Sequence, residues 1–265
     1  MLLRSFGPLT GLLVAALLIG TGGSPTLAPP QRPDSTALDS ALVRVDEMRS
    51  EGQFRDALSR LSGLRSEYGD RVEILWRLSF TRVDIAKTVD SENAAEQHYR
   101  KALKLAEAAL TVDASSAHAH LARAVAEGRM ALGAGTQERV QRSRAVKTHV
   151  DRAIEINPNL PGAFHVRGRW HRGVADLNFL ERTFVRTVYG GLPDASFEQA
   201  VRDFKRAIEL ENVRFHHLEL AKTYLKMDRP ADARAQLQTV IDLPAQEPFA
   251  QRYKEEAQRL LEDLS

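Results

Sequence analysis

The sequence has no cysteine in its 265 residues. Disulfide bonds, thiol nucleophiles, cysteine-based zinc sites and a lipidated N-terminal cysteine are therefore excluded. An excess of charge of one sign is also lacking, because 37 basic and 35 acidic residues leave a formal net charge of +2. Such a balance gives no electrostatic reason to expect a nucleic-acid partner.

The sequence also lacks the common motifs of catalysis. It has no P-loop, no Gly-x-Gly-x-x-Gly after a strand, no His-Glu-x-x-His and no Gly-x-Ser-x-Gly. Eight histidines are present, but no two lie four residues apart, so none can pair on one helix face as zinc-protease ligands do. We therefore predict that the protein is not an enzyme and uses no catalytic residues, metal or cofactor.

A long apolar run occurs only near the N-terminus. Arg4 precedes the run from Leu9 to Ile19, and small residues follow, which is the pattern of an export signal. The run is short for a membrane span, which needs about 20 apolar residues. We predict a signal peptide over 1–28, and the alternative is an uncleaved anchor formed by 9–20. Membrane contact is expected only in that alternative.

The residues that follow the apolar run, 29–37, form a proline-rich linker. An export signal before a cysteine-free helical chain predicts an exported bacterial protein, periplasmic or associated with the cell envelope.

From Leu38 onward one pattern recurs about five times. Each time, an amphipathic helix ends in a small residue that is followed by an aliphatic, a variable and a second aliphatic residue. An acidic or amide residue comes next. The pattern occurs at 109–113, 153–158, 207–212 and 240–244. Such a phrase closes each unit of a tetratricopeptide array. Only the interval from Ala207 to Val240 is near the usual period of about 34 residues, so the array is irregular.

The pattern predicts an all-α, tetratricopeptide-like solenoid over residues 38–265. The units are expected near 38–69, 71–114, 115–158, 160–212 and 214–244. The fourth unit is expanded by an insertion at 177–195 that carries an extra amphipathic helix. A capping helix is predicted near 246–263, with one apolar and one charged face.

The expanded unit resembles the regulator of microtubule dynamics protein family. The resemblance rests on 153–158, Gly168-Arg169-Trp170, Leu180-Glu181-Arg182, Tyr189-Gly190 and 195–200, and it covers most of 70–263. It implies an all-helical adaptor domain with no catalytic residues to carry over. Eukaryotic members are named for microtubule association and are intracellular. Because an export signal precedes this domain, we expect the fold and its groove to be shared, but not the microtubule role.

The first helix of each unit lines the concave surface of such an array. Counting along these helices predicts a basic strip with aromatic residues at one end, formed by Arg123, Arg169, Arg172, Lys222, Lys226, Trp76, Phe80 and His165. Guanidinium groups pair with carboxylate or phosphate oxygens. The competing interpretation is that these bases pair with Asp176, Glu181 and Glu127 and bind nothing. Trp170, beside the strip, is expected in the core.

These features predict a scaffold or adaptor that binds a protein or acidic peptide in a basic concave groove. The alternative is a carrier of a small anionic or lipid-like ligand in the same groove, with Phe179, Phe184, Val188 and Tyr189 of the insertion forming one wall. A deep apolar pocket would favour the carrier, and an open polar groove would favour the peptide-binding scaffold.

Overall fold

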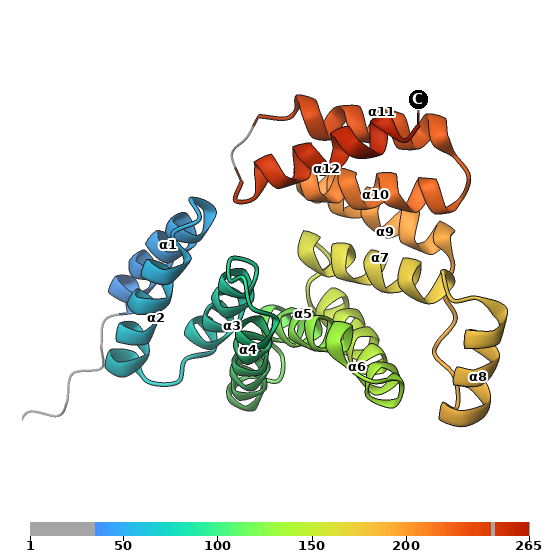
Figure 1. The fold of residues 1–265 in the computed structure, drawn as a ribbon. Coiled ribbons are helices and arrows are strands. Elements are labelled where there is room, and N and C mark those ends of the chain that lie inside the picture. Colours follow the sequence, from blue (N-terminus) through green and yellow to red (C-terminus); the bar gives the residue numbers. More distant parts are fainter. Residues whose placement is uncertain (1–34, 245–246, 265) are drawn as a thin grey trace, which may run out of the picture. The chain divides into compact units, whose positions relative to one another are not determined.

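Apolar residues at helical spacing fold into helices throughout the part of the chain that the structure describes. This computed structural model describes residues 35–244 and 247–264, which form twelve α-helices and no strand (Figure 1). The helices are α1 (Ser35–Ser50), α2 (Phe54–Tyr68), α3 (Val72–Ala86), α4 (Glu92–Val112), α5 (Ala117–Gly133), α6 (Thr136–Ile156), α7 (Pro161–Ala175), α8 (Phe179–Tyr189), α9 (Phe197–Leu210), α10 (Arg214–Lys226), α11 (Pro230–Asp242) and α12 (Ala250–Glu262).

The N-terminal predictions lie largely outside this part of the chain. The predicted signal or anchor at 1–28 falls outside the described residues, as does most of the linker at 29–37. Helix α1 begins at Ser35, so the first repeat starts inside the predicted linker rather than at Leu38. No helix among the described residues has the length and apolar character needed to cross a membrane.

The helices pack as successive hairpins. The pairs α1–α2, α3–α4, α5–α6, α7–α9 and α10–α11 form five units, and α12 packs on α11 and α10. Helix α8 is inserted between the two helices of the fourth unit and contacts α6 (Figure 1). The predicted solenoid, with one expanded repeat and a capping helix, is therefore confirmed.

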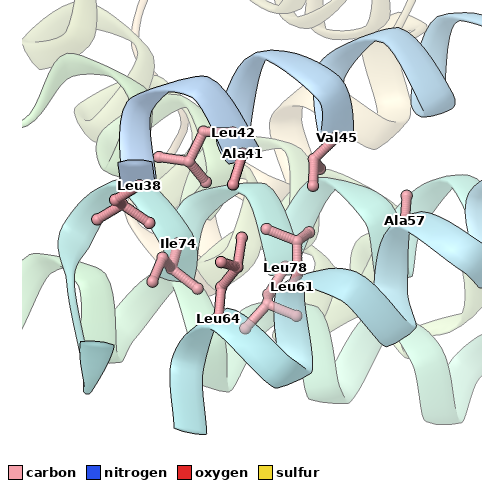
Figure 2. Close-up of a cluster of buried hydrophobic side chains, with 9 residues drawn as sticks. All are labelled: Leu38, Ala41, Leu42, Val45, Ala57, Leu61, Leu64, Ile74 and Leu78. Atoms are coloured by element: carbon pink, nitrogen blue, oxygen red, sulfur yellow. The ribbon is translucent and has the colours of Figure 1, made fainter. Parts of the chain in front are cut away.

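The first helices of the units form a continuous inner layer. Contacts run from α1 to α3, α5, α7, α10 and finally α12. Neighbouring units also share their cores. Figure 2 shows this for the first unit, where side chains of α1 and α2 pack with Ile74 and Leu78 of α3. Each unit therefore leaves apolar surface for the next to cover, as in other repeat proteins.

The fourth unit is held by an unusually close helix contact. Gly168 of α7 faces the fully buried ring of Phe204 on α9, and a Cβ added at Gly168 would lie 2.9 Å from that ring. Real Cβ atoms do not approach so closely, so only glycine lets α7 and α9 pack at this distance. The position of α7 matters because α7 forms part of the inner layer.

We predict that Gly168→Ala lowers the free energy of unfolding by about 1–3 kcal/mol, because the new methyl group overpacks the Phe204 contact. The matched control is Gly173→Ala in the same helix, where an added Cβ meets no atom within 4 Å. That change should raise stability by up to about 1 kcal/mol through helix propensity. Urea unfolding of both variants measures the difference, and equal stabilities would contradict the role given to Gly168.

Candidate functional site: a central cavity

A cavity of about 1180 Å³ lies inside the array. Its wall consists mainly of the inner helices α1, α3, α5, α7, α10 and α12, with contributions from α6 and α8. More than half of the lining residues are apolar. They include five of the ten phenylalanines of the chain: Phe54, Phe80, Phe184, Phe215 and Phe249. A concave, largely apolar site of this kind is the usual place for a bound ligand.

The first unit and the start of the capping helix meet at one edge of the cavity. Phe249, just before α12, stacks on Phe54 at the start of α2, with ring centroids 5.6 Å apart and planes inclined by 17°. The ammonium group of Lys87 lies 5.4 Å from the centroid of the Phe249 ring. Phe249 has a φ of 68°, which is unfavourable for a bulky residue. The surrounding contacts therefore hold this closure in place against a backbone cost.

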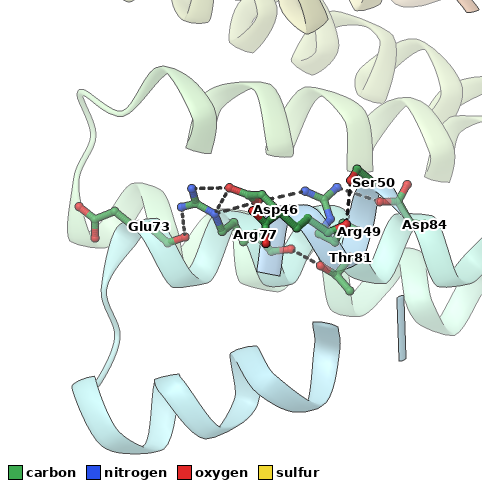
Figure 3. A network of polar contacts seen from close by, with 8 residues as sticks. Asp46, Arg49, Ser50, Glu73, Arg77, Thr81 and Asp84 are labelled. Atoms are coloured by element: carbon green, nitrogen blue, oxygen red, sulfur yellow. Dashed lines mark hydrogen bonds and ion pairs between the residues drawn. The ribbon is translucent and has the colours of Figure 1, made fainter. Parts of the chain in front are cut away.

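A polar network joins α1 to α3 on one side of the cavity (Figure 3). Arg77 donates to Asp46 at 2.8 Å, and Arg49 donates to Asp84 at 2.8 Å. Lys87 donates to the second oxygen of Asp84 at 2.9 Å. Burial opposes ionisation of Asp84, but Lys87 and Arg49 together hold its pKa below the usual value. These charges satisfy one another, so this network leaves little charge for a ligand.

A second polar cluster joins α7 to α10 around Glu219, whose side chain is only 12% exposed. Arg172 donates to the Glu219 carbonyl oxygen at 2.9 Å and also contacts its carboxylate. Lys222 and Arg169 lie 3.3 Å and 3.7 Å from that carboxylate. Burial opposes its ionisation, but Arg169, Arg172 and Lys222 hold the pKa of Glu219 far below the usual value. Glu219 is therefore a permanent anion with a structural role.

Arg129 of α5 differs from Arg139 and Arg252, the other cavity cations without an acidic partner among the described residues, because it is half-buried while they are exposed. It lines the cavity and has no hydrogen bond or ion pair with any residue that the structure describes. Burial, followed by repulsion from Arg169, lowers its pKa. The nearby Asp84 favours its charge but is already paired with Arg49 and Lys87. A half-buried guanidinium group without an ion-pair partner favours an anionic ligand, so Arg129 is the candidate anion contact of the cavity.

The predicted strip is not gathered on one surface. Three of its residues, Phe80, His165 and Arg169, line the cavity, and the other five do not. The cavity wall carries six basic and six acidic side chains, so it is balanced rather than basic. Ligand binding by the residues of the predicted strip stays a prediction.

The other four basic residues of the strip are held by acids, largely as the competing interpretation requires. Lys226 lies 2.9 Å from Asp176, and Arg123 lies 3.4 Å from Glu107 and 3.9 Å from Glu127. Arg172 and Lys222 share Glu219, an acid that the competing interpretation did not include. Glu181 instead completes a capping box with Asn178 at the start of α8.

The aromatic members of the strip take different places. Trp76 stacks on His118 at 4.6 Å, outside the cavity lining. His165 packs edge-on against Phe215, and its Nδ1 atom lies 2.9 Å from that of His216. Burial, and then His216, hold the pKa of His165 well below the usual value, so it is a neutral part of the wall.

Trp170 is only 6% exposed, as expected of a core residue. Its indole donates to the Ser143 carbonyl oxygen at 2.8 Å.

Four site residues were missed from the sequence: Phe54, Arg129, Glu219 and Phe249. For Arg129 a signal was present. The inward residues of α7, His165 and Arg169, are four apart, and the same spacing from Leu121 leads through Val125 to Arg129 on α5. No local signal marks the contact of Phe54 with Phe249. Among residues 35–244 and 247–264, no three histidine or acidic side chains are grouped to hold a metal ion.

Comparisons with known proteins point to one family. The family model described as "Regulator of microtubule dynamics protein 1-3" matches residues 41–265. Regulator of microtubule dynamics protein 3 of Mus musculus is 28% identical over 233 residues, covering 85% of this chain and 50% of that protein. Regulator of microtubule dynamics protein 1 of Bos taurus is 27% identical, covering 86% of this chain and 72% of that protein. The chain thus spans about half the length of the mouse relative.

A solved structure with a similar fold is a thermophilic TPR protein of Thermus thermophilus. It has a TM-score of 0.61 and 17% sequence identity, and covers 84% of this chain and 98% of that chain. This likeness supports the tetratricopeptide-like fold.

We predict that Glu219→Gln lowers the free energy of unfolding at pH 7 by about 3–5 kcal/mol, because three cations lose their shared anion. The lowered pKa of Glu219 gives stability that is fully present above the unfolded-state pKa of about 4.3 and is lost progressively as pH falls from there through the lower pKa of the folded state. Denaturation at several pH values should show this acid-dependent loss in the native protein and much less of it in the variant.

The matched control is Glu209→Gln on α9, where an exposed carboxylate pairs with Arg206. It should change stability by less than about 0.5 kcal/mol at any pH. A similar loss in both variants would show that Glu219 is not the interaction that joins α7 to α10.

Proposed function

The chain belongs to the regulator of microtubule dynamics protein family, and on that premise we propose that it is a non-enzymatic scaffold whose central cavity holds an amphipathic anion. The apolar body of the ligand lies along the phenylalanine-rich wall, and its anionic group lies against Arg129. The chain is then a carrier of a small anionic or lipid-like molecule.

The observation that carries this proposal is the unpaired Arg129 inside a mostly apolar cavity. The apolar lining favours a carrier over a protein that reads peptides in an open polar groove. Placing an anion against Arg129 would supply the acceptor that its guanidinium lacks, and charge-assisted hydrogen bonds of this kind are strong.

The charges of the wall support a ligand with one or two negative charges rather than a strongly acidic peptide. Three of the six cations there, Arg49, Lys87 and Arg169, already have acids, and six acidic groups would repel a polyanion. Among the paired cations, Arg169 is the one that can assist Arg129. Its side chain is 41% exposed, and it approaches Glu219 only to 3.7 Å, while Arg172 satisfies that carboxylate more closely.

A second candidate is an apolar segment of a partner protein that ends in a single carboxylate. The cavity volume of about 1180 Å³ favours it, because it exceeds the roughly 300–1,000 Å³ of small-molecule pockets. The names of the relatives also associate them with the regulation of a protein assembly.

In either case we propose that the protein acts outside the cytoplasm, in the periplasm or cell envelope, on the grounds of its N-terminal apolar run.

We predict that palmitate binds the purified chain and that Arg129→Gln weakens this binding about tenfold, because one charge-assisted hydrogen bond is lost. Hexadecanol, which has the same chain length and no charge, should bind the variant and the native protein equally. The control variant is Arg60→Gln, an exposed arginine on α2. Isothermal titration measures each affinity. Equal binding of palmitate by the native protein and Arg129→Gln would reject the role of Arg129.

Native mass spectrometry of the protein purified from its own cells identifies the natural ligand. A retained small molecule, absent from Arg129→Gln, supports the carrier. A retained polypeptide supports the second candidate instead. A ligand-free mass together with no binding of palmitate would reject the proposed carrier function.

We also predict that Phe249→Ala accelerates release of bound palmitate severalfold, because the variant removes the stack with Phe54 that closes one edge of the cavity. Stopped-flow displacement measures the rate. Phe179→Ala is the control, since that side chain is 80% exposed on α8. If release is unchanged in Phe249→Ala, ligands leave the cavity by another route.

A further inference from the structure

A second group of cations lies apart from the cavity, on helices α2, α3 and α4. Helix α3 packs against both α2 and α4. The group consists of four of the basic side chains on these helices: Arg55 on α2, Arg82 on α3, and His98 and Lys101 on α4. None of the four lines the cavity. We refer to them as the α2–α4 basic cluster.

The charges in this cluster act on one another without a nearby acid. After burial, the groups that lower the pKa of His98 are Arg82, Lys101 and Arg55, in that order. No acidic side chain among the described residues offsets them at His98. Elsewhere in the array most buried or half-buried arginines are paired with carboxylates, as Arg77 is with Asp46. The cluster is therefore a local excess of positive charge in a nearly neutral protein.

Two atoms of the cluster are buried and have no hydrogen-bond partner. They are Nε of Arg82 and Nδ1 of His98, which belong to neighbouring helices. Arg82 also forms no ion pair with any residue that the structure describes, and burial lowers its pKa. Buried polar atoms are nearly always hydrogen-bonded, and buried charges are nearly always paired. The Arg82 guanidinium therefore lacks an acceptor at Nε, and Nδ1 of His98 lacks a partner that a protonated ring could supply with a hydrogen.

We propose that the α2–α4 basic cluster is a binding site for a phosphate group. Phosphate fits better than a carboxylate because it presents three or more acceptor oxygens and nearly two negative charges at neutral pH. It can therefore accept from Arg82 and His98 at once while facing the exposed charges of Arg55 and Lys101. The site is independent of the central cavity and of the ligand proposed there.

Binding at this site is coupled to protonation of His98. Without phosphate, burial and then Arg82, Lys101 and Arg55 disfavour a charged imidazole, whereas a bound phosphate dianion favours it. The neutral ring therefore takes up a proton on binding. Affinity for phosphate is therefore expected to be higher near pH 6 than near pH 8. The increase ends at the lower pH where phosphate itself takes up a proton and loses its second charge.

The test follows the His98 ring by NMR in the full chain while inorganic phosphate is added. Chloride at the same ionic strength serves as the reference. The expected result is a saturable shift with phosphate and a higher His98 pKa in its presence. Arg82→Gln should weaken phosphate binding about tenfold or more, since it removes a charged donor. No response at His98, or an equal response to chloride, would overturn the proposal, because charge screening alone would explain it.

Two further variants keep this test decisive. Lys101→Gln changes an exposed residue and should weaken binding even if Arg82→Gln fails to fold. Arg60→Gln is the control on α2 and should leave phosphate binding unchanged. If Lys101→Gln and Arg60→Gln lose affinity equally, the effect is one of general surface charge and the site is rejected.

A comparison of ligands distinguishes a phosphorylated protein from free phosphate or a small phosphate ester as the source of the bound group. Tighter binding of a phosphoserine peptide than of inorganic phosphate, with none for the unphosphorylated peptide, assigns the site to a modified protein. Equal binding of phosphate and the phosphopeptide assigns it to free phosphate or a small phosphate ester. Palmitate binding should survive in Arg82→Gln, and phosphate binding should survive in Arg129→Gln. The two sites can therefore fail or succeed separately.

Discussion

The buried carboxylate of Glu219 is the interaction on which the cavity depends. It brings Arg169 and Arg172 of α7 together with Lys222 of α10, and so it fixes two neighbouring inner helices side by side. The same arrangement sets the electrostatics of the wall. Glu219 is committed to three cations from α7 and α10, so it is not available to Arg129 on α5, which repulsion from Arg169 further isolates. The fold and the proposed ligand position thus arise from one distribution of charge.

The close packing of α7 on α9 supports this arrangement. Because Gly168 has no side chain, the ring of Phe204 comes near the α7 backbone, and the Arg172 guanidinium lies 5.8 Å from the centroid of that ring. A larger residue at 168 would move the whole helix, and Arg169 and Arg172 with it. The expanded fourth unit therefore contributes to the site through helix position rather than through a motif of its own. The Gly-Arg-Trp sequence that resembles the family contains both the glycine and Arg169.

The sequence was sufficient to predict the helices but not the site. Apolar spacing and closing phrases are local signals, so they located the five units, the insertion and the capping helix. Which face points inward was harder to infer, because each residue turns a helix by about 100°. Counting Arg123 as inward on α5 selected the wrong face, and the structure places Arg129 there instead. The Phe54–Phe249 stack joins opposite ends of the array and depends on how its curvature accumulates, which no local pattern records.

The near-zero net charge of the chain has a different meaning once its ion pairs are known. With 35 acidic residues for 37 basic ones, acids are abundant enough to neutralise any buried cation. Arg129 and Arg82 are nevertheless without acids among the described residues, and each lies where desolvation lowers its pKa. Their surroundings differ in a way that separates their ligands. Arg129 lines a cavity that is rich in phenylalanine, which suits an anion with an apolar body, whereas Arg82 lies among other cations, which suits a compact group with more than one negative charge.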